Sequence, residues 1–125
     1  FAEFRGYTHD IAHHTSMGST PQGRGNAANK LATETIFEYA NRGQRPPNYV
    51  IRAHVHRYAD SFDNYITRAI ILPCWQYRTA FVHKINAGKL PSIGGVLCEI
   101  EDGKAPKWTA VIYKPRVTEE VTWRG

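Results

Sequence analysis

The sequence predicts an α/β protein in which one crossover helix is followed by a mainly antiparallel sheet. Three observations lead to this fold class. After residue 26, apolar residues recur at the spacing of a helix, and short runs of β-favouring residues lie before and after this segment. Near the C-terminus, two segments of alternating apolar and polar residues flank an Asp-Gly turn. The chain has 125 residues, 42% apolar and 22% charged, so we expect one folded domain over 1–125 and no wholesale disorder.

The N-terminal half predicts a strand, a long loop and a helix. The strand covers 7–13 and runs into a polar, glycine-rich loop over 15–25. Asn26 can cap the helix, Gly43 can take the left-handed position after its end, and Pro46-Pro47 forbids its continuation. The residues that recur on the apolar face of the helix are Ala28, Leu31, Ala32, Thr35, Ile36, Tyr39 and Ala40.

The C-terminal half predicts strands. The run 49–53 is apolar and too short for a helix, so it indicates a buried strand. Strands over 66–72 and 79–85 follow, and 96–101 and 108–113 form a hairpin with a loop longer than two residues. The charged tail, 116–125, is expected to be partly loose.

Composition excludes some classes of protein. No apolar run is long enough to span a membrane, and the first six residues lack the apolar stretch of a signal peptide, so we expect a cytoplasmic protein with no membrane partner. The first residue is not Met, so we expect the chain to belong to a longer polypeptide. Cys74 and Cys98 form no CxxC pair and are expected to be buried, reduced thiols. A single disulfide between them is the alternative. The net charge of +5 is scattered and is compatible with a phosphate-bearing partner.

Five of the six histidines fall in two groups, each at the end of a predicted strand. The first group is His9, His13 and His14, and the second is His54 and His56. Adjacent parallel strands bring such ends together, so the groups can share a site. Histidines at i and i+2 share a face in a strand, whereas in a turn they can splay toward two ions. Imidazole is a ligand of zinc, iron, nickel and manganese.

The segments Ile11-Ala12-His13-His14 and Ala53-His54-Val55-His56-Arg57-Tyr58 resemble the last two metal motifs of calcineurin-like metallophosphoesterases. The order of the motifs, the helix between them and the strands after them extend this resemblance over most of 7–113. It implies the C-terminal part of an αββα sandwich that hydrolyses phosphoesters. In that family two divalent ions, here Mn, Zn, Fe or Ni, activate water and neutralise charge on the phosphate.

Carried over by position, the resemblance implies that His13 and His54 bind one ion and His56 binds the other. His14 would lie in the second shell or face the substrate, and it remains an alternative to His13 as the ligand. Arg57 could approach the phosphate of a nucleotide, a nucleic acid or a phosphoprotein, whereas a solvent-facing Arg57 and a packed Tyr58 are the plainer interpretation. The resemblance assigns no catalytic residue within this chain.

Two departures from the family bear on function. Ala53 stands where the family has Gly, which requires a φ below zero there. The earlier motifs Asp-x-His and Gly-Asn-His do not occur before His13, so an N-terminal segment or another chain would have to complete the site. The isolated chain is therefore expected to be inactive, with weak or partial metal binding. The alternative is a non-catalytic phosphoesterase-like scaffold or a nucleic-acid-binding module.

Three further features have plainer interpretations. The loop over 18–25 lacks the Gly-Lys-Ser/Thr ending of a phosphate-binding loop. His9 and His83 lie within predicted strands and are expected to be packed. Trp75 could stack on a base, but we expect it to pack in the core, because buried aromatic rings dominate small cores.

Overall fold

The computed structural model describes residues 1–15, 26–75 and 92–113. Its elements are β1 (Ala2–Phe4), β2 (Tyr7–Ile11), α2 (Ala27–Asn41), β3 (Tyr49–Arg52), β4 (Ala59–Asp60), β5 (Arg68–Ile71), β6 (Ile93–Glu99) and β7 (Lys107–Tyr113). The predicted strand over 79–85, the tail over 116–125, His83 and nearly all of the 15–25 loop lie outside the described residues.

The main sheet has five strands in the order β1-β2-β3-β5-β4. Its centre is parallel, because β3 pairs in parallel with β2 and with β5, and its edges are antiparallel. The predicted crossover is confirmed by the parallel β2–β3 pair, and antiparallel pairing is confirmed at the edges and in the hairpin. The prediction is wrong for β5, which pairs in parallel with β3. The chain over 53–67 is long enough to return to the starting end of the sheet, so β5 runs in the same direction as β3.

The predicted helix is confirmed as α2, and its C-terminal end follows the expected signal. Gly43 has a φ of 67°, and the N–H groups of Gly43 and Gln44 donate to the carbonyls of Ala40 and Tyr39. This is the glycine-terminated C-cap that the sequence predicted. Asn26 stands at the N-cap position without a side-chain capping bond, and its Oδ1 accepts a hydrogen bond from Asn29 instead.

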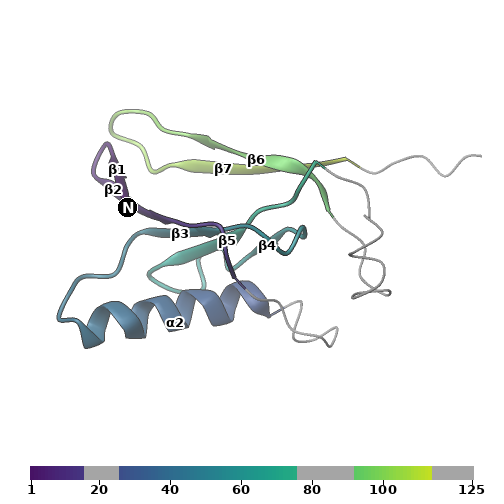
Figure 1. The fold of residues 1–125 in the computed structure, drawn as a ribbon. Helices are drawn as coiled ribbons and strands as arrows, with labels where there is room; N and C mark the ends of the chain where they lie inside the picture. The colour runs from purple at the N-terminus through teal and green to yellow at the C-terminus, as the bar shows by residue number, and fades with distance from the viewer. Residues whose placement is uncertain (16–25, 76–91, 114–125) are drawn as a thin grey trace, which may run out of the picture.

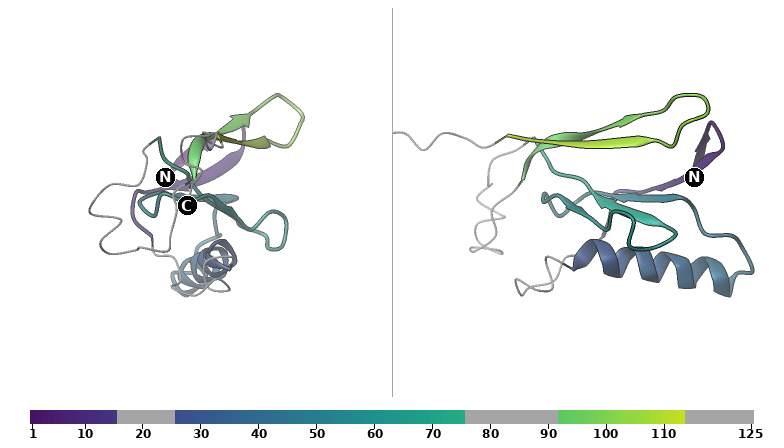
Figure 2. Two further views of the ribbon diagram at one scale, coloured as in Figure 1. Left: turned by 90° about the vertical axis from the view of Figure 1, so that its right-hand side faces the viewer. Right: turned by 180° about the vertical axis from the view of Figure 1, so that it is seen from behind.

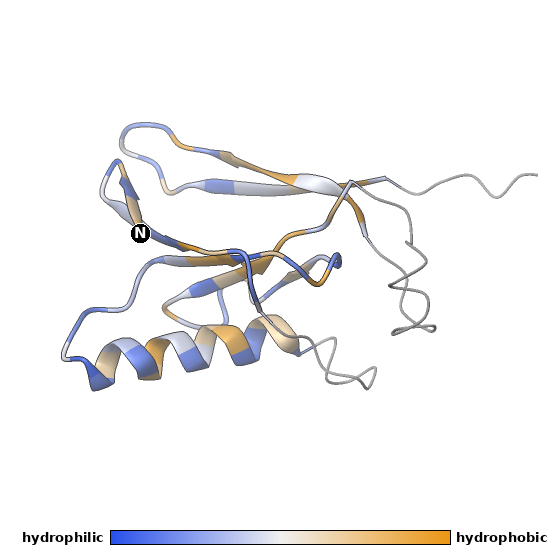
Figure 3. Ribbon diagram, viewed as in Figure 1, coloured by the Kyte–Doolittle hydropathy of each residue, from blue (hydrophilic) through white to orange (hydrophobic). Residues whose placement is uncertain are grey.

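The helix covers one face of the sheet and the hairpin β6–β7 lies along the other, so the fold has three layers (Figure 1). Figure 2 shows these layers from two further directions. Small residues line the helix-side core and allow α2 to approach the strands closely. This core consists of Ala27, Ala28, Ala32, Val50, Ala69 and Ile71. Apolar residues along β3 and β5 mark the middle layer (Figure 3).

Aromatic rings join the hairpin to the sheet. The Trp108 ring lies 5.0 Å from Tyr49 and 6.1 Å from His9, and the His9 and Tyr49 rings are stacked at 5.1 Å. His9 is therefore a buried packing residue, as predicted, and its Nδ1 is 3.0 Å from the Tyr7 carbonyl. At the far end of the hairpin, Asp102 forms an ion pair with Arg5 in the β1–β2 turn.

Both cysteines are half-buried thiols, and no disulfide joins them. Cys74 follows β5 and Cys98 lies in β6, where burial raises the pKa of its thiol. In the part of the chain that the structure describes, no helix combines the length and apolar character needed to cross a membrane.

A buried ion pair fixes the far edge of the sheet. The Asp60 side chain is only 2% exposed and accepts hydrogen bonds from Arg68 Nε at 2.9 Å and Nη2 at 2.7 Å. It also accepts from the Tyr58 hydroxyl at 2.9 Å and the Phe62 N–H at 2.7 Å. Four donors thus surround the carboxylate, and its hydrogen bonds with Arg68 raise the pKa of the guanidinium.

Asp60→Asn is expected to lower the free energy of unfolding by about 3 kcal/mol or more, because it leaves the Arg68 charge unpaired in a half-buried position. Urea denaturation followed by circular dichroism measures this loss. Asp63→Asn, at an exposed position three residues away, is the matched control and should change stability by less than about 0.5 kcal/mol. Equal effects of the two substitutions would contradict this account.

Burial lowers the pKa of His9 below its ordinary value of 6.5, and its backbone hydrogen bonds offset only part of that effect. The neutral ring is therefore favoured in the folded state. Its contribution to stability is complete above pH 6.5 and is lost as pH falls from there through the folded-state pKa. Between pH 8 and 5 the free energy of unfolding should fall more for the wild type than for His9→Phe, which keeps an aromatic ring but cannot titrate. Parallel pH profiles in urea denaturation would exclude His9 as the source.

Candidate metal centre

The candidate site lies where β2 and β3 end side by side. Hydrogen bonding continues beyond the two strands, since Ala12 N–H donates to the Ile51 carbonyl at 3.1 Å and Ala53 N–H donates to the His13 carbonyl at 2.8 Å. The residues immediately after these bonds are His14 and His54. The parallel register of the two strands thus brings the two histidine groups together, as the sequence predicted.

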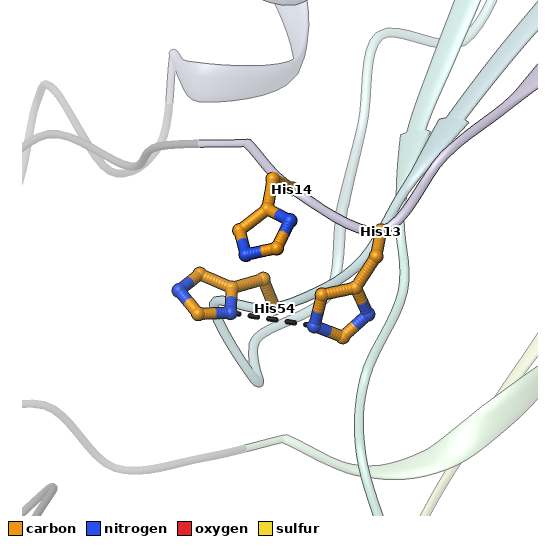
Figure 4. Close-up of side chains that lie close together, drawn as sticks. All are labelled: His13, His14 and His54. Carbon is orange, nitrogen blue, oxygen red and sulfur yellow. Dashed lines mark hydrogen bonds between the residues drawn. The ribbon is translucent and has the colours of Figure 1, made fainter.

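Three imidazoles meet at this point: His13, His14 and His54 (Figure 4). One nitrogen from each ring lies within 4.8 Å of the others, and all three residues are exposed. The ring centroids are 4.9 Å apart for His13 and His14, 5.3 Å for His13 and His54, and 4.6 Å for His14 and His54. The rings therefore face a common point that solvent reaches.

The spacing of the rings suits a metal ion. His13 Nε2 and His54 Nδ1 are 3.3 Å apart, which is long for a hydrogen bond between nitrogens. Nitrogen ligands lie about 2.0–2.1 Å from Zn²⁺ in a tetrahedral site, which places two of them about 3.3 Å apart. A ring nitrogen of His14 lies within 4.8 Å of these two atoms and supplies a third donor. The donor set therefore fits a transition metal.

The backbone of the second histidine segment turns sharply. His54 has a φ of 74° and His56 a φ of 58°, values that are uncommon for residues other than glycine, although histidine is among the types enriched there. Val55 N–H donates to the Ala53 carbonyl at 3.0 Å, which closes a three-residue turn around His54. Ala53, which stands where the family has Gly, has no positive φ. Its backbone therefore accommodates a Cβ, as the sequence required.

The turn separates His54 from His56. His54 is exposed and belongs to the cluster, whereas His56 is half-buried and lies outside it. The His56 carbonyl accepts a hydrogen bond from Ser92 N–H at 2.8 Å, and the Cys74 thiol is 4.0 Å from it. The structure thus brings together His13 and His54, the pair predicted to share one ion, with His14, which was predicted to lie beside them or to be the alternative ligand. His56, predicted to bind the other ion, lies outside this cluster.

Arg57 and Tyr58, the two residues after His56, have different surroundings. Tyr58 packs as expected, with its hydroxyl donating to Asp60, and burial together with that carboxylate raises the pKa of Tyr58 to about 12. Its phenol therefore stays protonated near neutral pH. Arg57 is half-buried next to His56.

Sequence analysis missed a polar network behind the site. Arg52 Nη1 donates to the Asp10 carbonyl at 3.0 Å and to Asp10 Oδ1 at 3.1 Å, and the Tyr39 hydroxyl donates to Asp10 Oδ2 at 2.9 Å. Burial and this hydrogen bond raise the pKa of Tyr39. The network joins β2, β3 and α2, and its strand residues Asp10 and Arg52 lie two or three positions before the histidines of the same segments. An aspartate and an arginine within short apolar strands were the signal that could have revealed it.

Comparison with known proteins gives no match: no family model, no curated protein and no solved structure is similar to this chain.

The two possible ligand sets make different predictions for metal binding. If the cluster holds the ion, His14→Ala should weaken Zn²⁺ binding to the chain by at least about 100-fold, since it removes a direct ligand. His56→Ala is the matched control, because it removes an imidazole two residues from His54 but outside the cluster. Isothermal titration calorimetry of the two variants distinguishes the sets. A large loss in His56→Ala with no loss in His14→Ala would exclude the cluster.

Proposed function

We propose that this chain contributes histidine ligands to the metal centre of an enzyme that hydrolyses phosphoesters. The observation that supports the proposal is the cluster of His13, His14 and His54 at the ends of two adjacent parallel strands. The resemblance of the two histidine segments to those of the calcineurin-like metallophosphoesterases supplies the reaction class. A net charge of +5 favours a phosphate-bearing substrate.

The three imidazoles would hold one ion and leave its remaining coordination positions open. Sites with three protein ligands and an open position are typical of catalytic zinc, whereas structural sites are closed by four. A bound ion would lower the pKa of its water and offset charge on the phosphate. The exposure of all three rings leaves room for a phosphoester beside them.

Orientation of the rings comes from the chain itself. The hydrogen bonds of Ala12 and Ala53 fix the ends of the two strands, and the three-residue turn fixes the direction of His54. The Arg52–Asp10 pair beneath them holds the same strands in register. Ligands on such supported positions lose little freedom when an ion binds.

A second ion is part of the proposal, as it is part of the family's chemistry. The resemblance gives His56 to that ion, on the other side of the turn from the cluster. Its remaining ligands, including a bridging carboxylate, would come from an N-terminal segment or another chain. Mn, Zn, Fe and Ni all suit imidazole combined with carboxylate.

A non-catalytic scaffold is the second candidate, and one observation favours it. Among the described residues, the cluster that could hold an ion contains imidazoles and no carboxylate. A protein that kept the fold and lost the bridging carboxylate would bind an ion weakly and hydrolyse nothing. In that case the basic charge would serve nucleic-acid binding instead.

Hydrolysis is tested on a polypeptide that joins this chain to a segment with the Asp-x-His and Gly-Asn-His motifs. With Mn²⁺ it should cleave bis-p-nitrophenyl phosphate, and His54→Ala should lower kcat/KM by at least about 100-fold because a direct ligand is lost. Arg45→Ala, which removes an exposed cation from the loop after α2, is the control and should retain the rate. Turnover by His54→Ala equal to that of the wild type would refute the proposal. Metal binding without turnover would favour the scaffold.

A further inference from the structure

The Asp102-Gly103 dipeptide lies in the loop that joins β6 to β7, as the sequence predicted. Lys104 N–H donates to the Glu101 carbonyl at 3.3 Å, which closes a four-residue turn with Asp102 and Gly103 at its centre. Gly103 has a φ of 75°, in the left-handed region that glycine adopts without strain. The Asp102 side chain is 83% exposed, so solvent reaches its carboxyl group.

The peptide nitrogen of Gly103 is equally open. Within the described ranges it donates no hydrogen bond to another residue. A Cβ built on Gly103 would meet no atom within 4 Å beyond its own chain neighbours. The nitrogen can therefore approach the carboxyl carbon of Asp102 without breaking a hydrogen bond of its own and without a side chain in the way.

Two of the other three aspartates are fixed by several donors. Asp10 accepts hydrogen bonds from Arg52 and from the Tyr39 hydroxyl. Asp60 is 2% exposed and accepts from four donors, and the N–H of the next residue, Ser61, donates to a carbonyl of β5 at 2.9 Å. Neither carboxyl group can turn toward the nitrogen that follows it without breaking these bonds.

Asp63 is the most informative comparison, because it is also exposed. The nitrogen that follows it belongs to Asn64, whose N–H donates to the Ser61 carbonyl at 3.2 Å and whose side chain donates to Asn29. Asn64 also carries a Cβ beside that nitrogen. All four aspartates of the sequence lie in the described residues, and Asp102 alone combines an exposed carboxyl group with a free nitrogen after it.

One interaction opposes reaction at Asp102. Arg5, in the turn between β1 and β2, forms an ion pair with Asp102 Oδ1. The two turns lie at the same end of the molecule (Figure 1). The ion pair requires an ionised carboxylate, so a reaction that removes the charge of Asp102 must break the pair. Because the Arg5 side chain is itself 55% exposed, the pair contributes little energy and slows such a reaction only slightly.

We propose that Asp102-Gly103 is a site of spontaneous isomerisation to isoaspartate, and that the ion pair with Arg5 slows it. The Gly103 nitrogen attacks the carboxyl carbon of Asp102 and forms a new N–C bond. The amide proton and the carboxyl hydroxyl leave together as water, which gives a five-membered succinimide. A second water then opens the ring. Attack at the side-chain carbonyl restores aspartate, whereas attack at the main-chain carbonyl gives isoaspartate.

The product has the same atoms as aspartate, since one water leaves and one is added. In isoaspartate the main chain passes through the former side chain, so the turn gains one main-chain carbon and the carboxylate is attached directly to Cα. The carboxylate then reaches less far toward Arg5, and the hairpin loop loses its ion pair with the β1–β2 turn. The histidine cluster takes no part in this reaction, so it can be tested separately from the proposed hydrolysis.

The test ages the whole chain in weakly acidic buffer made with oxygen-18 water, because each succinimide that opens leaves one oxygen-18 in the product. After tryptic digestion in ordinary water, mass spectrometry should find the label in the peptide that ends at Lys104. Electron-transfer fragmentation should locate isoaspartate at residue 102. The peptide that contains both Asp60 and Asp63 is the internal control and should stay unlabelled over the same time.

Two variants complete the test. Asp102→Glu keeps the carboxylate but would have to close a six-membered ring, which forms far more slowly, so the label should disappear. Arg5→Ala should raise the rate of labelling about twofold, the effect of removing an exposed ion pair. Equal labelling of the Asp63 peptide, or undiminished labelling in Asp102→Glu, would overturn the site. An unchanged or lower rate in Arg5→Ala would overturn the role of the ion pair.

Discussion

The pairing of β2 with β3 is the constraint on which the rest of this structure depends. A parallel pair brings its carboxyl ends to one edge of the sheet, and here each strand is followed directly by histidines. The pairing extends past both strands through the Ala12 and Ala53 hydrogen bonds. A slip of one residue would send alternate side chains to the opposite face and separate the imidazoles. The register of the two strands therefore decides whether the imidazoles meet.

Several interactions protect that register. The crossover helix packs alanines against β3 and β5, which buries one face of the parallel strands. The Arg52–Asp10–Tyr39 network joins both site-bearing strands to α2. On the other face, the hairpin is held by Trp108 and by the bond from Ser92 to the His56 carbonyl. Strained φ values at His54 and His56 persist because these surroundings determine the turn.

The hairpin has a second consequence. Cys74 makes an isolated bridge to the edge of β6 through hydrogen bonds with Ser92 and Gly94, and Trp75 follows it directly. One face of the hairpin packs on the sheet through Trp108, whereas Trp75, predicted to lie in the core, is 76% exposed.

The sequence alone determined the helix, its glycine C-cap, the approximate strands and the meeting of two histidine groups, because periodicity, capping and strand-end position are local properties. Only the tertiary structure decided that His14 joins His13 and His54 while His56 lies apart, since left-handed backbone at His54 and His56 cannot be read from residue types. It also decided the parallel course of β5 and the exposure of Trp75. Those features depend on which distant segment a strand pairs with and in which direction. The apolar character of a strand specifies neither.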